Sequence, residues 1–128
     1  MGSDYTAIEV CAGAGGQSIG LDRAGFTPVA LVEIDEWACK TLRRNRPSWT
    51  VYEGDAADPD VLPQGLRADL LAGGVPCPPF SRAGKQLGLD DERDLLFEMT
   101  VLAERHRPSA VMIENVRGLL DRRFDEYR

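Results

Sequence analysis

The chain has 128 residues, of which 43% are hydrophobic and 28% are charged, and its formal net charge is −6. This length corresponds to one domain, and the hydrophobic content is too high for a disordered chain. No apolar run approaches the roughly 18 residues that a membrane span needs, and no secretory signal opens the chain. The composition therefore excludes a membrane protein, a coiled coil and a disulfide scaffold, and it predicts a cytoplasmic location.

Strand and helix patterns alternate along the chain. We predict strands over residues 6–11, 27–33, 49–53, 69–73 and 110–114. Helices are predicted over residues 16–24, 36–45 and about 92–106, with Asp35 as the cap of the second helix, and a long loop is predicted over 76–91. This alternation is typical of an α/β fold with a mostly parallel sheet and helices on both faces. The pattern stops after the fifth strand, and an open sheet edge is an aggregation liability, so we expect an incomplete domain or a partner chain.

Cysteine and histidine content argues against a metal site. The three cysteines, Cys11, Cys39 and Cys77, form no CxxC pair, so neither a zinc site nor a disulfide framework is predicted. Free thiols suit a reducing compartment. The single histidine, His106, lies among charged residues and is predicted to be exposed to solvent.

Charge is distributed unevenly between the two halves. Residues 1–64 carry 5 basic and 10 acidic residues, whereas residues 65–128 carry 10 and 11. Such a composition binds phosphate poorly. Any contact with nucleic acid is therefore expected from the second half, or from a part that is not in this chain.

A glycine-rich turn joins the first predicted strand to the first helix, at Cys11-Ala12-Gly13-Ala14-Gly15-Gly16. Glycines let the backbone approach a ligand closely, and a helix N-terminus directs amides at it. Glu33 ends the second strand 20 residues after Gly13, where a carboxylate suits the two hydroxyls of a ribose. The glycines alone are weak evidence, because a tight structural turn is the alternative, but together with Glu33 they predict a nucleoside-bearing ligand.

The third predicted strand is followed by Gly54-Asp55-Ala56. Asp55 either accepts the exocyclic amine of an adenine or serves as a turn or cap residue. The last glycine of a GxGxxG fingerprint and the lysine of a Walker motif are both missing. Acidic strand ends around one crevice suit S-adenosylmethionine, whose sulfonium and amino groups are cationic.

The fourth strand leads into Val75-Pro76-Cys77-Pro78-Pro79-Phe80-Ser81. Cys77 lies between prolines at the carboxyl end of a strand, where open α/β sheets bind their ligands. A thiolate is intrinsically very nucleophilic. We therefore interpret Cys77 as a nucleophile, and Cys11 and Cys39 as structural cysteines.

Glu114 and Asn115 end the fifth predicted strand. A carboxylate in such a place is costly unless it meets a partner. Because the fourth and fifth strands are expected to be neighbours, Glu114 and Cys77 are predicted to face the same pocket. The alternative is that Glu114 pairs with a nearby arginine such as Arg117.

Taken together, these motifs resemble the cytosine-C5 DNA methyltransferase family over roughly residues 6–120. The resemblance implies a Rossmann-like S-adenosylmethionine-dependent methyltransferase fold, truncated after about five strands. It implies catalytic roles for Pro76, Cys77, Ser81, Glu114 and Asn115. It also implies that S-adenosylmethionine, or the product S-adenosylhomocysteine, is bound by Cys11, Ala12, Gly13, Gly15, Gly16, Glu33, Ile34, Asp55, Ala56 and Leu96.

The resemblance further implies a mechanism on double-stranded DNA. A target cytosine is flipped into the pocket, Cys77 attacks C6, and Glu114 holds N3 and the exocyclic amine. C5 then takes the methyl group, and loss of the C5 proton expels the cysteine. Asn115 would orient the Cys77 loop. DNA methylation of this kind is the modification activity of restriction-modification systems.

Several parts of the family pattern are expected after residue 128 and are not in this chain. They are the paired-arginine strand, the target-recognition region and a final asparagine motif. Residues 1–128 are thus expected to form one incomplete catalytic domain that needs a complementing C-terminal half. Two alternatives stay open, namely a non-catalytic remnant that binds cofactor or a partner, and a methyltransferase that acts on tRNA.

Overall fold

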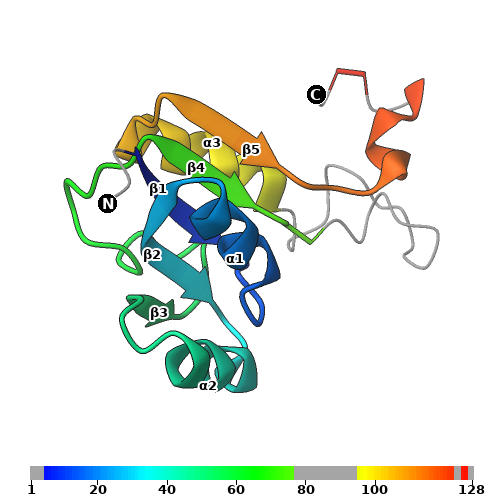
Figure 1. Ribbon diagram of the computed structural model, residues 1–128. Coiled ribbons are helices and arrows are strands. Elements are labelled where there is room, and N and C mark those ends of the chain that lie inside the picture. Colours follow the sequence, from blue (N-terminus) through cyan, green and yellow to red (C-terminus); the bar gives the residue numbers. More distant parts are fainter. Residues whose placement is uncertain (1–4, 77–94, 123–124, 127–128) are drawn as a thin grey trace.

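A single parallel sheet forms the centre of the computed structural model, which describes residues 5–76, 95–122 and 125–126. Its strands are β1 (Tyr5–Val10), β2 (Phe26–Glu33), β3 (Val51–Glu53), β4 (Leu70–Gly73) and β5 (Ala110–Ile113), in the order β3-β2-β1-β4-β5 (Figure 1). The helices are α1 (Gly16–Arg23), α2 (Glu36–Asn45) and α3 (Leu95–His106). All neighbouring strands that pair are parallel, which confirms the predicted architecture.

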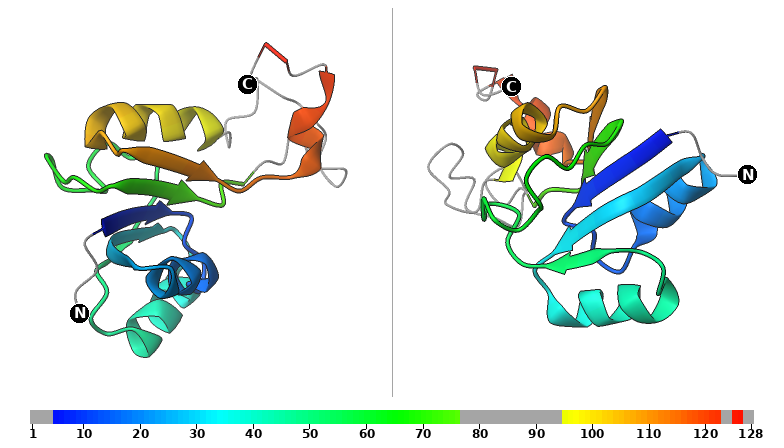
Figure 2. Two further views of the ribbon diagram at one scale, coloured as in Figure 1. Left: turned by 45° about the horizontal axis from the view of Figure 1, so that its top comes forward. Right: turned by 90° about the vertical axis from the view of Figure 1, so that its left-hand side faces the viewer.

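Helices cover both faces of the sheet, with α3 on one face and α1 and α2 on the other (Figure 2). Successive side chains of a strand point to opposite faces, so β1 contributes to both layers. Ile8 and Val10 belong to the larger buried cluster, which includes Met99 and Leu102 of α3. Ala7 belongs to the cluster beneath α1. None of the helices within the described ranges is long and apolar enough to cross a membrane.

Some element boundaries differ from the prediction by one or two residues. β3, for example, begins at Val51 rather than at residue 49, because Trp49 closes a turn in which its amide donates to the Arg46 carbonyl at 3.0 Å. A short 3₁₀ helix, Arg117–Leu120, was not predicted. The predicted residues 92–94 of the third helix lie outside the described residues.

Asp69 fixes the amino ends of three strands. Its carboxylate accepts hydrogen bonds from the amide and the hydroxyl of Thr6, at 2.7 and 2.9 Å. These bonds lower the pKa of Asp69. Its carbonyl accepts from the amides of Ser109 and Ala110, at 2.8 and 3.0 Å. One residue therefore sets β1, β4 and β5 in register, and their carboxyl ends finish together.

The prediction for His106, the last residue of α3, was wrong. His106 was expected to be exposed, yet it is buried, with 1% of its surface accessible. The segment before β4 folds over the end of α3, and the Leu66 carbonyl lies 2.7 Å from Nδ1 of His106. The charged neighbours of His106 in the sequence suggested an exposed side chain. The segment that covers it comes from forty residues earlier in the chain, so the local sequence could not indicate the burial.

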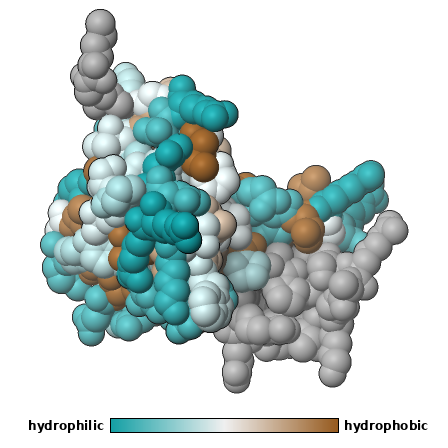
Figure 3. Space-filling model, turned by 60° about the horizontal axis from the view of Figure 1, so that its bottom comes forward, coloured by the Kyte–Doolittle hydropathy of each residue, from teal (hydrophilic) through white to brown (hydrophobic). Residues whose placement is uncertain are grey.

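α2 is amphipathic and its outer surface is charged. Asp35 caps it by accepting a hydrogen bond from the Ala38 amide at 2.7 Å, as predicted. The molecular face that includes α2 is mostly hydrophilic, with apolar residues scattered over it (Figure 3). On the inner side Cys39 is fully buried, which confirms it as a packing residue. Its thiol donates to the Glu33 carbonyl at 3.3 Å.

β5 is the edge strand on the side away from β3. Val111, Met112 and Ile113 remain 45%, 38% and 40% accessible, although all three are apolar. An apolar edge strand is unusual, because exposed edges are normally short, charged or covered. The prediction of an open edge after the fifth strand is confirmed for the described part of the chain.

Candidate functional site

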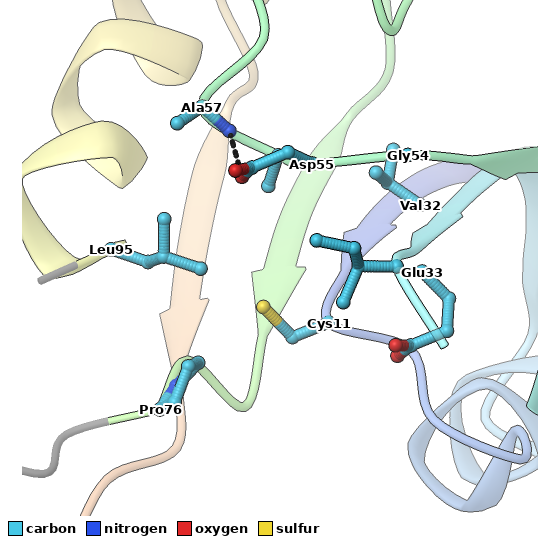
Figure 4. A pocket seen from close by; sticks show the side chains of 10 residues that line it. Cys11, Val32, Glu33, Gly54, Asp55, Ala57, Pro76 and Leu95 are labelled. Atoms are coloured by element: carbon cyan, nitrogen blue, oxygen red, sulfur yellow. Dashed lines mark hydrogen bonds between the residues drawn. The ribbon is translucent and has the colours of Figure 1, made fainter. Parts of the chain in front are cut away.

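A cavity of about 440 Å³ lies at the carboxyl edge of the sheet, within the size range of small-molecule sites. Its walls come from the ends of β1, β2, β3 and β4 and from the first turn of α3. Leu95 and Pro76 form one side, Val32 and Glu33 lie opposite, and Asp55 closes a third side (Figure 4). This position agrees with the rule that open α/β sheets bind ligands at their carboxyl ends.

The glycine-rich turn adopts backbone angles that favour glycine. Gly13 and Gly15 have φ values of 57° and 98°, in the left-handed region. A Cβ added to Gly13 would meet no atom within 4 Å. A Cβ on Gly15 would lie 2.6 Å from Cδ2 of Leu42. The left-handed backbone angle and the close contact with Leu42 of α2 therefore both favour glycine at position 15, while a Cβ at position 13 would enter open space.

Glu33 joins the glycine turn to the end of β2. Its Oε2 accepts from the Gly13 amide at 2.6 Å, and its Oε1 accepts from the Asp35 amide at 2.9 Å. Each carboxylate oxygen has two lone pairs, so both oxygens keep the capacity to accept one further hydrogen bond. Glu33 thus holds the turn in place and can still bind a pair of hydroxyls.

Asp55 combines the two roles that the sequence left open. Its Oδ1 accepts from the Ala57 amide at 2.9 Å, which makes it a turn residue (Figure 4). It also lines the cavity, together with Gly54, Ala56 and Ala57. Because the turn fixes the carboxylate, its second oxygen is available to a ligand donor.

Cys11 lines the cavity, and its surroundings disfavour the thiolate form. Its thiol lies between the walls of the cavity (Figure 4). Burial, and after it the carboxylates of Glu33, Asp55 and Glu9, raise the pKa of Cys11 to about 11. The thiol is therefore protonated at neutral pH, which agrees with the structural interpretation of Cys11.

A second buried acid, which the sequence analysis missed, lies beneath the glycine turn. Glu9 of β1 is 2% accessible and accepts a hydrogen bond from the hydroxyl of Ser18 in α1. Burial raises the pKa of Glu9 from 4.5 to about 7, although the Ser18 bond opposes the rise. The detectable signal was an acidic residue within an otherwise apolar predicted strand.

Glu114 lies beside the start of the predicted nucleophile segment. Its amide donates to the Gly73 carbonyl at 3.0 Å. Its Oε2 is so near Gly74 that a Cβ added there would lie 3.2 Å from it. The strand ends that carry Glu114 and Pro76 are therefore adjacent, as predicted. Cys77 and Ser81 themselves lie outside the described residues.

Asn115 follows Glu114 and is partly buried. Its Oδ1 accepts from the Val116 amide at 2.7 Å. Its Nδ2 is buried and has no hydrogen-bond partner among the described residues. The side chain thus keeps one unused donor close to the ends of β4 and β5.

The cavity contains some predicted cofactor residues and not others. Those that line it are Cys11, Glu33, Ile34, Asp55 and Ala56. The lining residues that the sequence analysis did not single out as cofactor contacts are Val32, Gly54, Ala57 and Leu95, together with Pro76, which was assigned a catalytic role. Leu95 and Leu96 both pack against the core, but only Leu95 lines the cavity, because consecutive helical residues point about 100° apart. Periodicity alone does not distinguish these two leucines.

Comparison with known proteins decides the family. The family model for C-5 cytosine-specific DNA methylases matches residues 5–128. The chain belongs to this C-5 cytosine-specific DNA methylase family. A type II methyltransferase of Neisseria gonorrhoeae, M.NgoMIV, is 61% identical over 127 residues. Those residues make up 97% of this chain and 39% of that relative.

Solved structures place this chain in a known fold. An Escherichia coli structure described as a prophage-encoded DNA modification methyltransferase matches 96% of this chain with a TM-score of 0.74 and 28% identity. An S-adenosylmethionine-dependent methyltransferase from Clostridium acetobutylicum shares the fold alone, with a TM-score of 0.58 and 13% identity. The predicted Rossmann-like methyltransferase fold is confirmed. The chain spans 35% and 40% of the length of these two proteins.

Metal ligands are not grouped in the described part of this chain. No set of three or more histidine, cysteine or acidic side chains converges there in a way that could hold a metal ion. The cavity itself is lined by the carboxylates of Glu33 and Asp55 and by apolar side chains.

Proposed function

We propose that this chain is the cofactor-binding and nucleophile-bearing part of a DNA (cytosine-5)-methyltransferase. The observation that carries the proposal is the meeting of two groups of residues at one sheet edge. Glu33 and Asp55 face the cavity, and Glu114 lies next to the strand end that leads into Pro76-Cys77. Type II methyltransferases among the relatives point to a place in restriction and modification of DNA.

S-adenosylmethionine fits the residues of the cavity. Its ribose hydroxyls suit Glu33, whose two oxygens each keep a free lone pair. Its adenine amine suits the fixed carboxylate of Asp55, and apolar walls at Val32, Ile34 and Leu95 suit the ring faces. We assign the glycine turn, Ala12, Gly13, Gly15 and Gly16, to the amino-acid end of the cofactor. When bound, the cofactor supplies an electrophilic methyl group on a sulfonium.

The chain's own residues activate the cytosine. The Cys77 thiolate adds to C6 of a flipped base, which makes C5 nucleophilic. The Glu114 side chain binds N3 and the exocyclic amine, and it stabilises the charge that develops on the ring. After C5 has gained the methyl group, loss of the C5 proton restores the double bond and expels Cys77. Asn115 and Ser81 are assigned to positioning the Cys77 segment, and Pro76 to restricting it.

A complementing C-terminal half is the partner that this proposal requires. Relatives in the family are much longer than this chain, which spans 39% of M.NgoMIV. The exposed apolar edge at Val111, Met112 and Ile113 is the surface on which further strands would add to the sheet. We propose that DNA affinity and base choice reside in that other half, since the charge of this chain is −6.

The decisive experiment traps the covalent intermediate. The chain, combined with a C-terminal half from a type II relative, is incubated with duplex DNA that contains 5-fluorocytosine and with S-adenosylmethionine. Fluorine at C5 cannot leave as a proton does, so the enzyme should stay attached to DNA through Cys77. Cys77→Ala should form no adduct, and Cys39→Ala serves as the matched control that still does. An adduct absent from the wild type would favour a non-catalytic remnant, and one formed on RNA alone would favour a tRNA substrate.

A further inference from the structure

The last turn of α3 holds the segment that carries Asp55. Nη1 of Arg105 donates to the Pro59 carbonyl at 2.9 Å, forty-six residues earlier in the chain. His106 contacts the Leu66 carbonyl through Nδ1 at 2.7 Å. Leu62, between these two points, is buried in the cluster that also contains Met99 of α3. Residues 55–66 are thus attached to α3 at three places.

Hydrogen-bonded turns connect these attachments to Asp55. Ala57 donates to the Asp55 side chain, and Asp58 donates to the Asp55 carbonyl at 3.0 Å. Val61 in turn donates to the Asp58 carbonyl at 3.2 Å. Pro59, which Arg105 holds, lies inside this run of turns. A shift at Pro59 is therefore transmitted to the carboxylate of Asp55.

What His106 contributes at this position is a hydrogen-bond donor, as a comparison with an apolar side chain shows. A carbonyl can only accept, so Nδ1 of His106 carries a proton and donates it to the Leu66 carbonyl. Nε2 is buried and finds no partner within the described residues. An unpaired buried polar atom is destabilising, so a leucine would fill this space at lower cost. What a leucine lacks is the donor to Leu66.

We propose that Arg105 and His106 are positioning residues for the cofactor, because they fix the cavity wall that recognises its adenine. This inference rests on the proposed function of the cavity. Neither side chain is among the cavity-lining residues. They act through residues 55–66, and α3 therefore serves the cavity twice, with Leu95 in its wall and its last turn behind the Asp55 segment.

The test measures adenine recognition rather than affinity alone. Calorimetry on the 128-residue chain gives dissociation constants for S-adenosylhomocysteine and for S-inosylhomocysteine, in which a carbonyl replaces the adenine amine. His106→Leu and Arg105→Met should weaken binding of the adenine compound about tenfold and leave binding of the inosine compound nearly unchanged. His106→Asn keeps a donor near Nδ1 and should restore the preference for adenine.

Two further variants make the outcome unambiguous. Glu104→Gln alters an exposed side chain of the same turn and should behave as the wild type. Glu33→Gln, on the ribose side, should weaken both compounds by a similar factor. Thermal melting establishes a temperature at which each variant is folded. If His106→Leu does not fold, Arg105→Met alone decides.

Two results would overturn the inference, and they differ. Equal weakening of both compounds in His106→Leu and Arg105→Met would mean that these residues serve stability only, while the cavity keeps its proposed ligand. Failure of the wild-type chain to bind S-adenosylhomocysteine at all would overturn the proposed function of the cavity and the inference with it.

Discussion

Replacing the buried acid beneath the glycine turn should change how stability depends on pH. Glu9 is 2% accessible, and burial raises its pKa from 4.5 to about 7. Between these values the folded protein keeps a proton that the unfolded chain has released. The free energy of unfolding should therefore fall as pH rises from about 4.5 to about 7, and it should level off above that range.

The size of this loss follows from the shift in pKa. At about 1.4 kcal/mol per unit, a rise from 4.5 to about 7 corresponds to at most about 3 kcal/mol of lost stability at pH 8. Glu9→Gln keeps a neutral side chain that can still bind Ser18. Its stability advantage over the wild type should therefore grow by up to about 3 kcal/mol between pH 4.5 and pH 8.

Urea denaturation at several pH values measures this difference directly. Glu36→Gln is the matched control, because it removes one negative charge from an exposed site paired with Lys40. It should show no comparable gain, which separates local burial from the general effect of the −6 net charge. Parallel pH curves for the wild type and Glu9→Gln would refute the reasoning, since the carboxyl would then ionise as easily in the folded state as in the unfolded one.

Three other substitutions test the packing and the site. Gly73→Ala should lower the free energy of unfolding by about 1–3 kcal/mol in urea titrations, because its Cβ would lie 2.9 Å from Val10 and 3.2 Å from Met99; an unchanged midpoint would contradict this packing. Glu33→Ala should weaken S-adenosylhomocysteine binding at least about tenfold by calorimetry, and an unaltered dissociation constant would remove Glu33 from the ligand site. Asp69→Asn should lower the melting temperature at neutral pH and reduce the stability lost on acidification, since a depressed pKa contributes stability that disappears as pH falls through it. A melting curve identical to that of the wild type at both pH values would show that the Asp69 carboxylate does not stabilise the strand ends.

The sequence predicted the parts of the fold that depend on local pattern. Alternating apolar runs located all five strands, and Asp35 marked the start of α2. The acid at the end of β2 was also readable, because Glu33 follows an apolar strand at a fixed distance from the glycine turn. These features are set by neighbours within a few residues, or by one spacing that the strand-turn-helix unit imposes.

Contacts between distant segments were not readable in the same way. His106 was predicted to be exposed because its neighbours in sequence are charged, but the Leu66 segment covers it. An acid within an apolar strand indicates that Glu9 is buried, but it does not show how far packing raises the pKa of Glu9. Leu95 rather than Leu96 lines the cavity, a distinction that depends on how α3 packs against the sheet and not on the helical pattern.

What the sequence determined by itself is therefore the order of the elements and the chemical groups available at the strand ends. The tertiary structure decided which of those groups meet. Parallel pairing brings Glu33 and Asp55 to one cavity, although 22 positions separate them, and sets Glu114 beside Gly74. It also decided ionisation, because the pKa of Glu9 and of Cys11 depends on how much water the packed helices and sheet leave around them.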